Sequence, residues 1–131
     1  AHSCSLVGKT PPLSSTRRSV GAGRYHTCGV TSSGSVECWG IDDGSWYDSG
    51  QVIPPSGTFL SVSAGEYHTC GVTSSGSVEC WGSDEYGQIT DTPSGTFQSV
   101  SAGRQHTCGV TSAGSLECWG ADYYGQVSGT P

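Results

Sequence analysis

The strongest constraint on this chain is an internal repeat. One segment occurs three times, as SVGAGRYHTCGVTSSGSVECW at 19–39, SVSAGEYHTCGVTSSGSVECW at 61–81 and SVSAGRQHTCGVTSAGSLECW at 99–119. The loop that follows the first copy, at 41–51, is longer than its counterparts at 83–88 and 121–126. A period of about 40 residues is typical of stacked units that each bury surface against their neighbours.

The repeat divides the chain into an extension and three units. We expect the N-terminal extension at 1–18 and the units at 19–60, 61–98 and 99–131. Within each unit the strand-forming runs are short and bounded by glycine, which is typical of β structure. The expected fold class is therefore all-β.

The cysteines agree with one particular hairpin register. Residues 32–34, Ser-Ser-Gly, suit a three-residue hairpin loop with a left-handed glycine. With this loop Cys28 faces Cys38 at a non-hydrogen-bonded position, where Cα atoms about 4.5 Å apart accept a disulfide. A two-residue turn would place the two cysteines on opposite faces. The same register recurs in each unit, so we expect three disulfides: Cys28–Cys38, Cys70–Cys80 and Cys108–Cys118.

Two other interpretations of these cysteines are open. The thiols could be reduced and buried, or His26, Cys28 and Cys38 could bind zinc. Three ligands without a partner motif fall short of the four that structural zinc takes. The seventh cysteine, Cys4, lies in the extension, and an odd cysteine in a secreted chain suggests a bond between two chains.

The charge and composition of the chain limit which kinds of partner and which cellular compartment we expect for it. The chain has 11 acidic and 5 basic residues, and Arg17-Arg18 is its single adjacent basic pair, which disfavours nucleic acid as a partner. No apolar run approaches the roughly 20 residues of a membrane span. The chain starts at Ala1 rather than Met, as expected of a mature N-terminus left by processing. Together with paired cysteines, this predicts a secreted, extracellular protein.

Each unit has the form AGxxHTCGVTSSGSVECWGxDxxGQ and resembles a repeat of the regulator of chromosome condensation family. In compactness it is similar to a secreted bacterial β-lactamase inhibitor propeller of that type. The resemblance implies a partial β-propeller of three blades, each a short antiparallel sheet, with Trp39, Trp81 and Trp119 packed between blades. Nothing here matches the basic segment of the nucleotide-exchange members, so their chromatin and GTPase roles are not implied.

Several polar residues are of the types found in catalytic and metal-binding sites. His26, His68 and His106 occupy one repeat position, and their presence in every unit predicts a packing role rather than one active site. The paired acids at 42–43 and 84–85 lie in loops, where solvation of a turn is the expected role and weak calcium binding the alternative. We therefore expect no enzyme activity, no cofactor and no metal.

Loop aromatics are the candidate binding residues. Small and acidic residues surround them, a composition typical of surfaces that recognise a glycan or another protein. The alternative is that the rings cover the contact between blades. The candidate positions are Asp42, Asp43, Trp46, Tyr47, Tyr86, Tyr123 and Tyr124.

Three blades turn through less than half of a seven-bladed ring and leave two open faces. We expect chains to associate head to tail, as a ring-closing homo-oligomer or a filament, and to form an extracellular structural or binding assembly. A lectin or a protein-binding, inhibitor-like propeller module is the alternative function.

Overall fold

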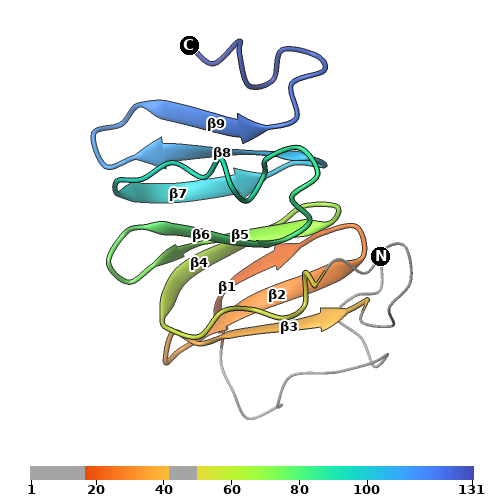
Figure 1. Ribbon diagram of the computed structural model, residues 1–131. Coiled ribbons are helices and arrows are strands. Elements are labelled where there is room, and N and C mark those ends of the chain that lie inside the picture. Colours follow the sequence, from red (N-terminus) through yellow and green to blue (C-terminus); the bar gives the residue numbers. More distant parts are fainter. Residues whose placement is uncertain (1–16, 42–49) are drawn as a thin grey trace.

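The computed structural model describes residues 17–41 and 50–131, and all of their regular structure is β. Within these two ranges, nine strands form three antiparallel sheets of three strands each (Figure 1). This confirms the all-β, three-blade fold. Sheet 1 contains β1 (Arg17–Ala22), β2 (His26–Thr31) and β3 (Val36–Gly40); sheet 2 contains β4 (Phe59–Ala64), β5 (His68–Thr73) and β6 (Val78–Gly82); sheet 3 contains β7 (Phe97–Ala102), β8 (His106–Thr111) and β9 (Leu116–Gly120).

The three sheets are stacked in chain order (Figure 1). The turns β1–β2, β4–β5 and β7–β8 lie at one end of the stack, and the hairpins β2–β3, β5–β6 and β8–β9 lie at the other. We call the first end the loop end, because the segments that leave β6 and β9 also start there. Backbone hydrogen bonds join those segments to the turns, from Ser83 N to Tyr67 O (2.8 Å) and from Ala121 N to Gln105 O (2.9 Å).

The hairpins have the register predicted from the cysteines. Thr31 N donates to Ser35 O at 2.9 Å, and Gly34 adopts the left-handed φ of 94° that this loop needs. Cys28 lies opposite Cys38, and the equivalent cysteines of the other sheets are also paired. All three disulfides are formed, with Cα–Cα distances of 4.1, 4.0 and 4.0 Å.

Strand alternation gives each sheet two different faces. The forward face, towards the next sheet, carries the His, Cys and Val of the central strand, such as His68, Cys70 and Val72. The rear face, towards the preceding sheet, carries the Thr of the central strand, the Trp of the third and the Phe that begins the first.

The core lies between these faces. Between sheets 1 and 2, the forward Cys28 and Val30 pack against the rear Phe59, Val62 and Trp81. A second cluster repeats this arrangement between sheets 2 and 3, with Phe97 and Trp119 on the rear face. Trp81 and Trp119 therefore pack between blades, as the family resemblance implied, whereas no described sheet lies behind Trp39.

In sheets 2 and 3 the first residue is a phenylalanine that packs on the rear face. Phe59 pairs with Thr73, and its ring lies across Gly71, where an added Cβ would come 2.8 Å from the ring. The equivalent residue in sheet 1 is Arg17, which pairs with Thr31. Sheet 1 therefore begins with an arginine at the position where the other two sheets begin with a phenylalanine.

Candidate functional site

The repeated histidines hold neighbouring sheets together. His26 Nε2 is hydrogen-bonded to Thr69 Oγ1 at 2.6 Å, and His68 Nε2 to Thr107 Oγ1 at 2.8 Å. Burial lowers the pKa of His26 and of His68 to about 4, and the neighbouring histidine adds to the effect. Both rings are therefore neutral near pH 7 and serve as packing groups.

The repeated tryptophans bond across the same interfaces. Trp81 Nε1 donates to Gln51 O at 2.9 Å, and Trp119 Nε1 donates to Gln88 O at 3.0 Å. In sheet 1, Trp39 Nε1 and Thr27 Oγ1 are buried without a hydrogen-bond partner among the residues that the structure describes.

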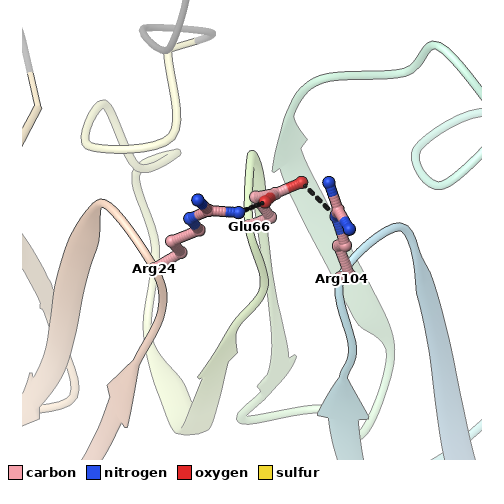
Figure 2. A network of polar contacts seen from close by, with 3 residues as sticks. All are labelled: Arg24, Glu66 and Arg104. Carbon is pink, nitrogen blue, oxygen red and sulfur yellow. Dashed lines mark hydrogen bonds and ion pairs between the residues drawn. The ribbon is translucent and has the colours of Figure 1, made fainter.

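The loop end carries a group of charges that ties three sheets together. Glu66, in the β4–β5 turn, accepts a hydrogen bond from Arg24 Nη1 at 2.6 Å and from Arg104 Nε at 2.8 Å (Figure 2). The carboxylate side chain is 2% exposed, whereas the two guanidinium side chains are 58% and 72% exposed. Because both ion pairs join different sheets, they fix two exposed cations at defined positions.

Aromatic rings flank these charges. Tyr25 and Tyr67, the residues after Arg24 and Glu66, are stacked with their ring centroids 5.5 Å apart, and Arg24 lies 5.1 Å from the Tyr25 ring. The hydrogen bond to Glu66 raises the pKa of both Arg24 and Arg104. Two permanent cations, one of them beside an aromatic ring, suit recognition rather than proton transfer.

The predicted binding tyrosines lie at the same end. Tyr86 follows sheet 2 and contacts Tyr123, which follows sheet 3, edge to face at 5.5 Å. The hydrogen bond to Tyr123 raises the pKa of Tyr86. Tyr86 thus takes part in contact between blades, whereas Tyr123 is 68% and Tyr124 92% exposed. A binding role for these tyrosines stays a prediction, and the other candidates lie outside the described residues: Cys4, Asp42, Asp43, Trp46 and Tyr47.

The acidic loops stabilise their own turns. Asp84 Oδ1 accepts hydrogen bonds from Ile89 N at 2.8 Å and Thr90 N at 2.9 Å, and these bonds, led by the one from Thr90, lower the pKa of Asp84. Asp122 Oδ1 likewise accepts hydrogen bonds from Val127 N and Ser128 N. Within 17–41 and 50–131, no three His, Cys, Asp or Glu side chains cluster as metal ligands would.

A hollow of about 250 Å³ lies at the hairpin end of sheet 2. Its walls are mainly Ser and Thr residues of 56–58 and 73–77, with Phe59 and Glu79. No cation is among the described residues that line this hollow, so the loop end, with its fixed arginines, is the stronger candidate. No helix long and apolar enough to cross a membrane occurs in the described part of the chain.

Sequence reasoning missed Arg24, Glu66 and Arg104. A signal was present, because this position reads Arg, Glu, Arg in repeats that are otherwise nearly identical. Opposite charges at one position of adjacent repeats indicate side chains that meet across the contact between blades.

Comparison with known proteins identifies the repeat. The model of the regulator of chromosome condensation (RCC1) repeat matches residues 18–45, 59–88 and 97–126, the greater part of the chain. The chain belongs to the RCC1 repeat family. Among curated protein sequences, none matches it.

Solved structures agree with this family. The crinkly WD40 ectodomain of the Arabidopsis thaliana receptor kinase ACR4 is 29% identical, with a TM-score of 0.70 over 92% of this chain and 42% of that one. The ectodomain of the Physcomitrella patens receptor kinase CR4 is 26% identical, with a TM-score of 0.69 over 85% of this chain and 32% of that one. Yeast RCC1 (Prp20), solved with Kap60, is 18% identical and has the same fold, with a TM-score of 0.63 over 81% of this chain and 32% of that one. The RCC1-type chain spans less than half the length of each of these structures.

Proposed function

We propose that this RCC1-type chain is an extracellular, non-enzymatic binding module that recognises another protein with its loop end. The observation that carries the proposal is the Arg24–Glu66–Arg104 group, which holds two exposed arginines in place, with Arg24 beside the stacked rings of Tyr25 and Tyr67. Arg and Tyr are among the residues that contribute most to binding at protein interfaces. The disulfides and the likeness to two receptor-kinase ectodomains support an extracellular location.

The test is a binding screen of the purified chain against an array of extracellular protein domains and, in parallel, a glycan array. We expect a protein ligand whose affinity falls by about tenfold or more in Arg104→Ala and Tyr123→Ser, because both side chains are exposed at the loop end. Trp46→Ala and Tyr47→Ala are expected to weaken the same binding.

The matched control is Ser112→Ala, at the hairpin end of sheet 3, which should bind as the wild type does. Melting temperatures measured beside each affinity separate lost binding from lost folding. A ligand found on the glycan array alone, or protein binding that both loop-end variants retain, would refute recognition of a protein by this surface.

A second candidate role is assembly, in which the three blades are completed by blades from outside the described residues. The observation that favours it is the exposure of Val20 in sheet 1, which is 62% exposed, whereas its repeat counterpart Val62 is 6% exposed in the core between sheets 1 and 2. In self-association, a second copy would supply the missing blade, and Cys4 would link the chains. The concentration dependence of the wild-type mass, with and without reductant, tests this form of assembly.

A further inference from the structure

The charged group at the loop end contains one more positive charge than negative charge. Glu66 supplies a single carboxylate, whose Oε2 accepts a hydrogen bond from Arg24 Nη1 and whose Oε1 accepts one from Arg104 Nε (Figure 2). A guanidinium group carries several N–H donors, and one donor atom of each arginine bonds Glu66. Both arginines can therefore bond a further acceptor.

The two arginines repel each other across Glu66. The hydrogen bond to Glu66 is the main cause that raises the pKa of both guanidinium groups, whereas the charge of Arg24 lowers the pKa of Arg104. Because such an effect acts at short range, the two cations are close neighbours. Among the described residues, Glu66 is the carboxylate that raises both pKa values, and its one charge balances only one of the two cations.

The backbone holds the three turns of this group in register. Arg24 N donates to Gly65 O at 3.4 Å, and Glu66 N donates to Arg104 O at 3.3 Å. The turns of neighbouring sheets are thus joined by main-chain hydrogen bonds as well as by the ion pairs. Side chains that are already fixed lose less conformational freedom when a partner binds them.

A partner that covers the loop end must balance the second cation. Burying an unpaired charge costs much more free energy than burying one that is paired and hydrogen-bonded. A carboxylate from the partner would accept N–H donors of the arginines and make the buried group neutral, with two guanidinium groups and two carboxylates. Hydrogen bonds between ionised groups are also among the strongest that a protein surface can form.

The rest of the chain limits how much negative charge the partner can bring. The formal net charge is −6, and the exposed Asp84, Glu85 and Asp122 lie in the segments that leave sheets 2 and 3 at the loop end. A polyanion, such as a nucleic acid or a sulfated glycan, would bring many charges close to these carboxylates and be repelled. A protein segment with one acidic side chain among uncharged ones meets the requirement without this repulsion.

We propose that the loop end selects a protein segment that places one acidic side chain against Arg24 and Arg104. The carboxylate of that side chain completes the charge balance that Glu66 leaves unfinished. This inference rests on the protein recognition proposed above and names the chemistry of the partner.

Selection of short random peptides displayed on phage tests the charge requirement. We expect Asp or Glu to be enriched among peptides selected on the wild-type chain. The enrichment should be lost on Arg104→Gln, because Arg24 and Glu66 then form a neutral pair. The matched control is Arg18→Gln, which removes the same charge beside the hairpin residue Gly34 and should select the same acidic peptides as the wild type.

Calorimetric titration of synthetic peptides measures the size of the effect. One peptide is the most enriched acidic sequence, and the other carries Asn or Gln in place of its acid. We expect the acidic peptide to bind the wild type about tenfold or more tightly than the amide peptide. Arg104→Gln and Arg24→Gln should each bind the two peptides alike. Circular dichroism and melting temperatures establish that each variant is folded, and either variant suffices if the other does not fold.

The outcomes separate this inference from the recognition on which it rests. If acids are not enriched on the wild type over Arg104→Gln, or if the wild type binds both peptides equally, selection by a carboxylate is wrong. Recognition by the loop end then stands if Tyr123→Ser weakens binding of the selected peptides, and it fails as well if that variant binds them as the wild type does. Tighter binding of a sulfated glycan than of any acidic peptide would overturn the choice of a protein partner.

Discussion

At the scale of single residues, the buried histidines make stability depend on pH. His26 and His68 have a pKa of about 4 in the folded protein, against about 6.5 in an unfolded chain. Between these values the unfolded state binds more protons, so stability falls as pH drops from 6.5 to 4 and is fully present above 6.5. Each histidine contributes up to about 3 kcal/mol to this loss.

We expect His68→Gln to reduce this loss. Glutamine can still bond the Thr107 hydroxyl but cannot take up a proton, so the free energy of unfolding should change less between pH 7 and pH 4.5. Urea denaturation at the two pH values measures the difference, and His26→Gln/His68→Gln should flatten it further. A wild-type pH dependence in the double variant would exclude the histidines as its source.

At the scale of elements, the three disulfides close loops of equal length but differ in burial. Cys70 is fully buried in the cluster with Phe97 and Trp119, whereas Cys108 is half-buried on the open face of sheet 3. The loop-closure contribution, about 2 to 3 kcal/mol, is common to both bonds. The packing contribution comes mainly from the disulfide of Cys70, which lies beneath sheet 3.

We therefore expect Cys70→Ala/Cys80→Ala to lower the free energy of unfolding more than Cys108→Ala/Cys118→Ala does. The extra loss should be about 1 kcal/mol or more, because buried sulfur contacts are removed beneath Trp119. Denaturant titration of the two variants beside the wild type measures it. Equal losses would show that the sheets do not pack as tightly as described.

At the scale of the whole molecule, the backbones of neighbouring sheets approach each other so closely that two glycines leave no room for a side chain. An added Cβ on Gly65 would lie 2.4 Å from Gly103 O in the next sheet, and one on Gly23 would lie 2.3 Å from Gly65 O. Neither glycine has a positive φ, so the constraint is the neighbouring backbone rather than the local conformation. The atoms nearest to an added Cβ on Gly103 belong to the ring of its own His106, and no described sheet follows sheet 3.

Gly65→Ala should therefore destabilise the protein by about 1 to 3 kcal/mol or more by separating sheets 2 and 3. Gly103→Ala is the matched control at the same repeat position, where the half-buried His106 ring can move aside, and it should cost less. Thermal unfolding of both variants measures the difference. If Gly103→Ala proved the more damaging, local strain rather than contact between sheets would be the cause.

The sequence alone determined the elements and their register. The spacing of Cys28 and Cys38 around a Ser-Ser-Gly loop allows one hairpin pairing, because side chains alternate between faces and a shift by one residue separates the sulfurs. Repetition then extends that result to every unit. The sequence also predicted the packing role of the histidines and tryptophans, because residues that recur in every unit are expected to make the same contact in every unit.

Only the tertiary structure decided which side chains meet across the interfaces. Arg24, Glu66 and Arg104 stand about 40 residues apart, and nothing local distinguishes an exposed arginine from one that pairs with the next blade. Likewise, Tyr86 and Tyr124 look alike in the repeat, yet one contacts Tyr123 and the other is exposed. The physical reason is that such contacts depend on how whole sheets stack, which residue spacing within one unit does not specify.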